Sequence, residues 1–117
     1  RHNRTLETIA NAGRLEQKEG NHAAAVDLLR EAWFGYRDVI GFDNRSTQII
    51  TVWLAESLRE LGQVREAVAI VERMYWDLED RAPGNADAQR HAALLSELWA
   101  ALGESDRATR WAARGAG

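Results

Sequence analysis

The sequence predicts an all-α fold in which three antiparallel helix pairs stack as a short α-solenoid. The first observation is an internal repeat: three eight-residue segments align, and their glycines, Gly20, Gly62 and Gly103, are 42 and 41 residues apart. The second is that apolar residues recur at spacings of three and four on both sides of the glycine, as in amphipathic helices. The third is that the alternating pattern of β-strands is absent. Self-similarity at such a period is typical of helical repeat arrays.

Each repeat is predicted to form two helices that meet at the glycine. The second repeat has one apolar stripe before Gly62 and one after it, namely Ile50, Trp53, Leu54, Leu58 and Leu61, then Val64, Ala67, Val68, Val71, Met74, Tyr75 and Leu78. Glycine suits the end of the first helix because it tolerates positive φ. Five residues later an alanine (Ala25, Ala67 or Ala108) lets the two helices approach closely. We expect helices near residues 4–19, 22–40, 45–61, 64–81, 86–102 and 105–114, in the pairs 4–40, 45–81 and 86–114.

The segments between repeats are predicted to be turns. Gly41-Phe-Asp-Asn44 and Ala82-Pro-Gly-Asn85 contain residues that break helices. Each segment ends in an asparagine, whose side chain can accept a hydrogen bond from the first amides of the next helix. New helices are therefore expected just after residues 44 and 85.

Length and composition indicate one globular domain over residues 1–117. The chain has 45% hydrophobic and 28% charged residues, close to the globular average. It begins at Arg1 without a methionine, so we expect a domain cut from a longer protein or a processed product. The lack of cysteine excludes disulfides and cysteine metal sites. No signal or membrane-spanning segment is visible, and we expect a cytoplasmic protein that does not bind membranes.

The sequence also argues against nucleic-acid binding, cofactors and catalysis. The net charge is −3 with both signs interspersed, so the basic stripe that phosphate binding requires is missing. No glycine-rich phosphate loop or nucleophile elbow is present. The histidines lack a metal-ligand spacing; we interpret His91 as a polar position of the fifth helix, and His2 and His22 as surface residues. We expect no cofactor, no metal and no enzymatic activity.

The repeat resembles the tetratricopeptide repeat (TPR). The resemblance rests on a first helix that ends in Leu-Gly, an alanine five residues later and the loop Gly41-Phe-Asp-Asn-Arg-Ser-Thr47. The period near 42 is similar to that of the longer kinesin-light-chain variety, which recurs in bacterial and fungal signalling proteins. The resemblance implies a right-handed solenoid and a non-catalytic scaffold that binds another protein or a peptide.

In this family the first helices of successive repeats line a concave groove. The resemblance implies that its positions stand 13, 10, 6 and 3 residues before each glycine, with an edge position nearby. They are Glu7, Ala10, Arg14, Gln17, Ile49, Val52, Glu56, Arg59, Arg90, Ala93, Glu97 and Ala100, with Asn11, Trp53 and Leu94 at the edge. The expected peptide-binding residues are Asn11, Arg14, Ile49, Trp53, Glu56, Arg59, Arg90, Leu94 and Glu97. The alternative is a solvated helix face with ion pairs for the charged residues, and a place in the core for Trp53.

Two adjacent aromatic pairs, Trp33-Phe34 and Tyr75-Trp76, occupy equivalent repeat positions. Neighbours on a helix lie about 100° apart, so both members of a pair cannot face one seam. We expect Phe34 and Trp76 to point outward, either packed under the inter-repeat loop or exposed as a self-association patch. A structural module that joins copies into a homo-oligomer through this convex face is the second functional hypothesis. An accessory domain of a larger enzyme or regulator is the third.

Overall fold

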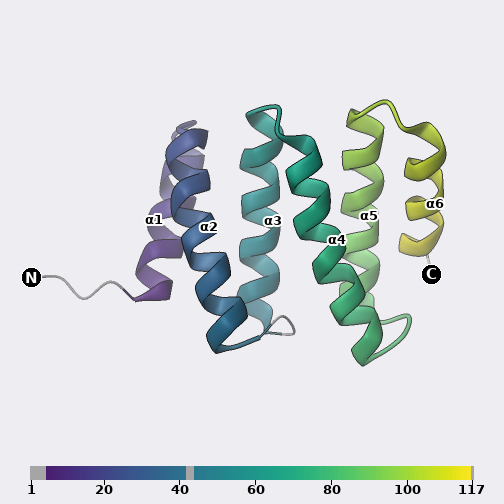
Figure 1. Cartoon of the computed structure of the whole chain (residues 1–117), viewed down its shortest axis with the longest axis horizontal. Helices are drawn as coiled ribbons and strands as arrows, with labels where there is room; N and C mark the ends of the chain where they lie inside the picture. Colours follow the sequence, from purple (N-terminus) through teal and green to yellow (C-terminus); the bar gives the residue numbers. More distant parts are fainter. Residues whose placement is uncertain (1–4, 42–43, 117) are drawn as a thin grey trace, which may run out of the picture. The chain divides into compact units, whose positions relative to one another are not determined.

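The computed structural model describes residues 5–41 and 44–116, and these residues form six α-helices (Figure 1). The helices are α1 (Leu6–Lys18), α2 (His22–Val39), α3 (Arg45–Glu60), α4 (Val64–Arg81), α5 (Ala86–Ala101) and α6 (Ser105–Gly115). The two described ranges contain no strand, which confirms the all-α prediction. The predicted helix ends lie within two residues of the observed ends. The start predicted at residue 4 lies outside the described residues.

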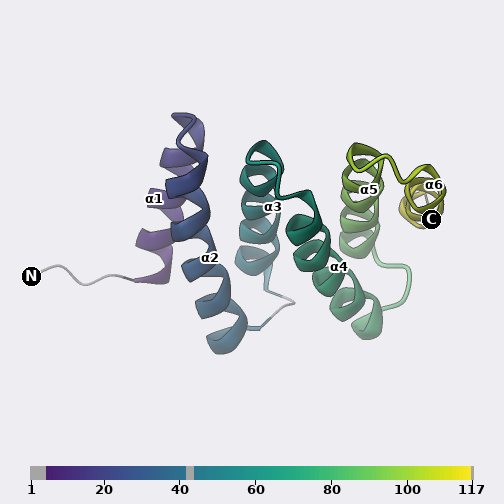
Figure 2. The same ribbon diagram turned by 45° about the horizontal axis from the view of Figure 1, so that its top comes forward.

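The chain divides into two compact units, residues 1–62 and 63–117. The first unit holds α1, α2 and α3, and the second holds α4, α5 and α6. Within each unit, consecutive helices run antiparallel (Figures 1 and 2). The single domain expected from the chain length stays a prediction.

Helices α1, α3 and α5 begin at residues whose side chains cap them. Thr5 Oγ1 accepts from the Thr8 amide at 3.1 Å. Asn44 accepts from the amide of residue 46 and Asn85 from the amide of residue 88, both at 2.8 Å. Capping by the two asparagines was predicted and is confirmed, because each satisfies an amide that has no partner inside the helix. Residues 42 and 43, in the middle of the first predicted turn, lie outside the described residues.

Helices α2, α4 and α6 instead follow tight turns centred on glycine. Gly20, Gly62 and Gly103 have φ values of 83°, 78° and 78°, which confirms the prediction of positive φ. A Cβ built on Gly20 would meet nothing within 4 Å. Backbone conformation rather than crowding therefore requires glycine at this turn.

In the first unit, α2 packs against both α1 and α3. Ala25 and Leu29 of α2 are fully buried, as the close approach predicted at Ala25 requires. Gly13 brings α1 close to α2, since a Cβ there would lie 2.8 Å from Leu29 Cδ2. The Trp33 indole N–H donates to Thr51 Oγ1 at 2.8 Å. Polar as well as apolar contacts thus join α2 to α3.

In the second unit, α5 packs against both α4 and α6. Helix α6 has no fully buried residue, and an aromatic cluster attaches it to α4. The Trp111 ring centroid lies 4.8 Å from that of Tyr75 and 6.1 Å from that of Trp76. The Arg114 guanidinium lies within 6 Å of all three ring centroids and donates to the Tyr75 hydroxyl at 3.1 Å. The guanidinium therefore adds cation–π attraction and a hydrogen bond to this attachment.

The two aromatic pairs are oriented as predicted. Trp33 and Tyr75 are buried, whereas Phe34 and Trp76 are 44% and 41% exposed. The rings of each pair meet edge to face, which is a favourable geometry for aromatic side chains. The outward members are thus partly supported by their buried neighbours.

His91 lies on the fifth helix, as predicted, whereas the interpretation of His22 as a surface residue needs correction. His91 belongs to the core, with 4% of its surface exposed. It stands 12 residues before Gly103, and the buried Ile50 stands 12 before Gly62, so the repeat register carries His91 inward. His22 is half-buried rather than a surface residue, and its Nδ1 lies 3.1 Å from Ser57 Oγ. His2 lies outside the described residues.

Candidate functional site

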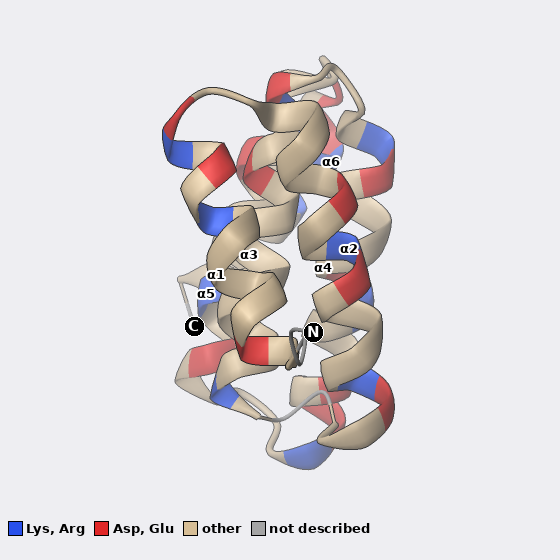
Figure 3. Ribbon diagram, turned by 90° about the vertical axis from the view of Figure 1, so that its left-hand side faces the viewer, with Lys and Arg blue, Asp and Glu red and all other residues tan. Residues whose placement is uncertain are grey.

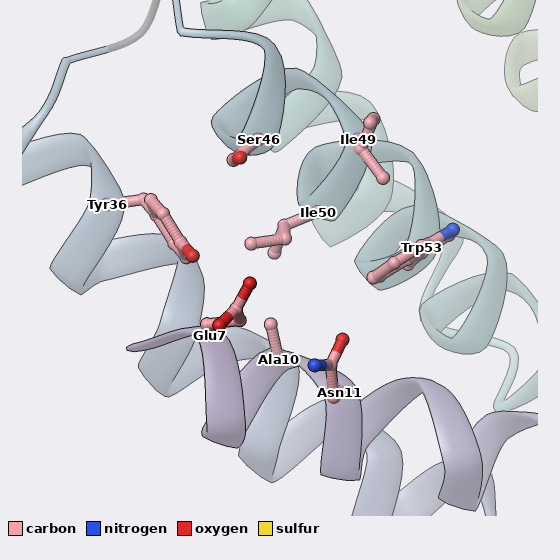
Figure 4. A pocket seen from close by; sticks show the side chains of 8 residues that line it. All are labelled: Glu7, Ala10, Asn11, Tyr36, Ser46, Ile49, Ile50 and Trp53. Atoms are coloured by element: carbon pink, nitrogen blue, oxygen red, sulfur yellow. The ribbon is translucent and has the colours of Figure 1, made fainter. Parts of the chain in front are cut away.

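The first unit presents a surface formed mainly by α1 and α3, which we call the α1–α3 surface. Two neighbouring hollows lie on it. A small cavity of about 130 Å³ is lined by Glu7, Ala10, Asn11, Tyr36, Ser46, Ile49, Ile50 and Trp53 (Figure 4). A wider, open hollow of about 500 Å³, the charged hollow, is lined by Arg14, Gln17, Lys18, His22, Glu56, Arg59 and Glu60. Six predicted site residues therefore line the hollows of one surface: Asn11, Arg14, Ile49, Trp53, Glu56 and Arg59.

The small cavity combines an apolar floor with a polar rim. Ala10 and Ile50 are buried at its base, while Ile49 is 37% exposed. The oxygen ends of Glu7 and Tyr36 point toward the same space in front of Ile50 (Figure 4). Such a cavity can cover the apolar stem of one side chain and offer hydrogen-bond acceptors to its polar end.

The charged hollow is organised around Arg14. Its guanidinium lies 4.9 Å from the Trp53 ring centroid, and its Nη1 lies 3.5 Å from Glu56 Oε1. The Arg14–Glu56 pair is too exposed to contribute more than about 1 kcal/mol. A second contact, an Arg14 Nη1 donation to Gln17 Oε1 at 2.5 Å, fixes the direction of the guanidinium. Arg14, Lys18 and Arg59 share the lining with two acidic residues, Glu56 and Glu60. This hollow is therefore mixed in charge rather than simply basic, and residues of both signs also occur on the helices of the chain (Figure 3).

Gln17 connects α1 to α3 through two hydrogen bonds, of which the one to Ser57 is buried. Its Nε2 donates to the Trp53 carbonyl at 2.6 Å and to Ser57 Oγ at 2.8 Å. Ser57 Oγ accepts this bond, so its own hydrogen can point to the nearby His22 Nδ1. We call Arg14, Gln17, Ser57 and His22 the Gln17 network. It directs the Arg14 guanidinium and ties α1 to the backbone of α3 at Trp53.

Ser57 was not among the predicted site residues, although the sequence carries a signal for it. It stands five residues before Gly62, where the other two repeats have Leu15 and Leu98. A polar residue at a repeat position that is otherwise apolar requires a hydrogen-bond partner if it is buried. Comparison of the repeats could therefore have identified Ser57 as half of a buried polar pair.

The comparisons with known proteins concern the fold. No protein-family model and no curated protein matches the sequence. The structure is similar to the crystal structure of nearly identical TPR-like repeats from a protein of Podosopora anserina described as a kinesin light chain, with a TM-score of 0.85 and 19% sequence identity. The match covers 95% of this chain and 53% of that chain. The chain has a TPR-like repeat fold.

The TPR-like fold confirms the predicted resemblance and the all-α repeat architecture. At 53% coverage, the chain spans about half the length of the protein that it matches. TPR-like repeats are generally interaction scaffolds, and their curved stacks present extended binding surfaces. The likeness concerns the fold and does not identify what this chain binds.

The remaining predicted site residues lie on α5 in the second unit. Arg90 is exposed and forms an ion pair with Asp87, three residues earlier. Leu94 is half-buried and Glu97 is exposed. An exposed pair within one helix contributes little to stability, so Arg90 does not act as a structural tie. The part of these three residues in binding stays a prediction.

The described residues contain few groups suited to acid–base catalysis or metal binding. Burial of the imidazole, and then the positive charge of Arg90, lowers the pKa of His91 to about 4. His91 is therefore neutral at physiological pH and lacks access to a substrate. Within residues 5–41 and 44–116 no group of three or more His, Cys, Asp or Glu residues could hold a metal ion. None of the described helices is long and apolar enough to cross a membrane.

Proposed function

We propose that the chain is a non-catalytic module that binds a peptide segment of another protein, and that the α1–α3 surface makes the contact in the first unit. The observation that carries the proposal is the pair of neighbouring hollows around Trp53 and Arg14. The Gln17 network orders the Arg14 guanidinium and bonds the α3 backbone at Trp53. A binding surface gains affinity when its contact side chains are already ordered, because less conformational entropy is lost on binding.

The size of the small cavity and the openness of the charged hollow favour a peptide over a small molecule. A cavity of about 130 Å³ is smaller than the roughly 300–1,000 Å³ of most small-molecule and cofactor sites. The cavity volume is close to the volume of about 150 Å³ that accommodates a benzene-sized group, so the cavity fits one side chain. The adjoining charged hollow is open and carries residues of both signs. An extended or helical peptide could place one side chain in the cavity and polar groups over the hollow.

Three residues of α5 are the proposed contacts of the second unit. Arg90, Leu94 and Glu97 stand 13, 9 and 6 residues before Gly103. Ile49, Trp53 and Glu56 stand at the same distances before Gly62. Equivalent positions of different repeats commonly have equivalent roles, which supports their inclusion.

A peptide selection tests the proposal. Random peptides displayed on phage are selected against the 117-residue chain, and the affinity of enriched peptides is measured by fluorescence anisotropy. The variant Ile49→Arg fills the mouth of the small cavity and should weaken binding at least about tenfold, a loss of about 1.4 kcal/mol. Val39→Arg is the matched control, because Val39 is a 77% exposed apolar residue that lines neither hollow.

Charge reversal at Arg59 and at Arg90 provides a second comparison. Either change should weaken binding if the peptide carries acidic groups near the reversed residue, since like charges repel. Equal affinities of the wild type, Ile49→Arg and both charge reversals would move the binding site away from the proposed surface.

Self-association through Phe34 and Trp76 is the second candidate, supported by their exposure. Each ring already has an arginine beside it: the Arg37 guanidinium lies 4.8 Å from the Phe34 centroid, and that of Arg114 lies 5.0 Å from the Trp76 centroid. These cations cover part of the apolar surface that a homo-oligomer would need. Sedimentation equilibrium separates the candidates, because a strict monomer at high concentration rules self-association out. The hypothesis of an accessory domain concerns the parent protein and requires the flanking sequence.

A further inference from the structure

We infer that the small cavity receives a basic side chain, lysine or arginine, of the bound peptide. The inference rests on the proposed function and adds to it the chemistry of the residue that enters the cavity. Three features of the cavity carry it: its charge, its apolar walls and its size.

The charge of the cavity is negative. Glu7 is the charged member of the eight lining residues, and neither lysine nor arginine is among them. Within the described part of the chain, no side chain forms a hydrogen bond or ion pair with the Glu7 carboxylate. The Asn11 carbonyl oxygen and the hydroxyls of Tyr36 and Ser46 add further acceptors. A cationic donor complements this set of groups, whereas an acidic side chain would be repelled by Glu7.

The walls of the cavity suit the stem of a long basic side chain. Ala10, Ile49 and Ile50 provide aliphatic surface, and Trp53 provides an aromatic ring. Lysine and arginine bury their methylene groups along such surfaces and keep the charged end near water or an anion. The Trp53 ring already supports one guanidinium, that of Arg14, which lines the charged hollow and not the cavity. Aromatic rings attract cations through their quadrupole.

The size of the cavity restricts it to a single side chain. A volume of about 130 Å³ is close to the roughly 150 Å³ that encloses a benzene-sized group. A purely aliphatic side chain of suitable size would cover the Glu7 carboxylate without replacing its bonds to water, which costs free energy. A lysine or arginine avoids that cost because its charged end takes the place of the water.

A double-mutant cycle tests the inference. A peptide from the selection described above is synthesised in two forms, one with the arginine or lysine that it carries and one with glutamine in its place. The dissociation constant of each form is measured for the wild type and for Glu7→Gln, which keeps the size of the side chain and removes its charge. We expect Glu7→Gln to weaken the basic peptide about fivefold and to leave the glutamine peptide unchanged. The fivefold difference should shrink as salt is raised, because screening weakens an exposed ion pair.

Glu19→Gln is the matched control, since Glu19 is an exposed residue at the other end of α1 that lines neither hollow. Circular dichroism is used to check that both variants fold. The glutamine peptide tests the same contact without any change to the protein. If peptides bind but Glu7→Gln affects both forms equally, the inference is overturned while the proposed function stands. The same holds if the enriched peptides lack basic residues. If the wild type, Ile49→Arg and both charge reversals bind equally, the proposed binding site fails and the inference falls with it.

Discussion

Protonation of His91 should destabilise the folded protein in mild acid. The imidazole is buried, and its pKa is lowered to about 4, first by desolvation and then by the charge of Arg90. In the unfolded chain a histidine takes up its proton near pH 6.5. Between these two values the unfolded state binds more protons than the folded state, so the free energy of unfolding falls as the pH falls. The stabilisation is complete above pH 6.5 and is lost as the pH approaches 4.

The expected loss is about 3 kcal/mol between pH 7 and pH 4, from a shift of about 2.5 units at 1.36 kcal/mol each. This is a large part of the stability of a domain of this size. Urea unfolding followed by tryptophan fluorescence at several pH values measures it. Carboxylates also titrate in this range, so the wild type is compared with a variant that lacks the imidazole. His91→Ile is suitable because isoleucine stands at the equivalent position of the second repeat, Ile50. Parallel pH profiles of the two proteins would refute the reasoning.

Three further changes test local parts of the fold. Gly20→Ala forces a non-glycine residue to φ 83° and should lower the free energy of unfolding by about 1–2 kcal/mol; an unchanged urea midpoint would contradict this. Asn85→Ala removes the cap of α5 and two bonds from its side-chain amide to the carbonyls of residues 78 and 82, and should cost about 1 kcal/mol in the same assay. Arg114→Ala removes the cation from the aromatic cluster and should speed amide exchange in α6 about fivefold, with α2 amides as the internal control.

The helices and turns could be predicted because their causes are local. Positive φ at Gly20, Gly62 and Gly103 and side-chain capping by Asn44 and Asn85 each depend on residues within one turn. Apolar spacing of three and four then places the buried face of each helix. The same local geometry explains why the exposed members of the aromatic pairs were identified correctly.

His91 shows where local reasoning stops. The sequence identified it as a polar position of the fifth helix but did not show its burial, and the register of the repeat places it with the buried Ile50. Its Nδ1 lies 2.9 Å from the Asp87 carbonyl oxygen of the preceding helical turn, while Nε2 has no hydrogen-bond partner among the described residues. Among the described residues, Trp99 Nε1 is also buried without a partner. The sequence alone does not reveal the cost of these buried polar atoms, because it depends on what surrounds each ring.

The Gln17 network favours a recognition role for Arg14 on the α1–α3 surface, which stays a proposal. A solvated helix face with ion pairs would leave Arg14 free to change rotamer, since an exposed pair with Glu56 holds it only weakly. Gln17 removes that freedom by accepting from Arg14 with its oxygen and donating to α3 with its nitrogen. The sequence places Gln17 on the correct face, but it cannot show that a partner on α3, 36 residues away, is in reach. Ordering an arginine side chain costs conformational entropy. Because Arg14 is already ordered in the free protein, less entropy would be lost when a partner binds, which favours a role in recognition.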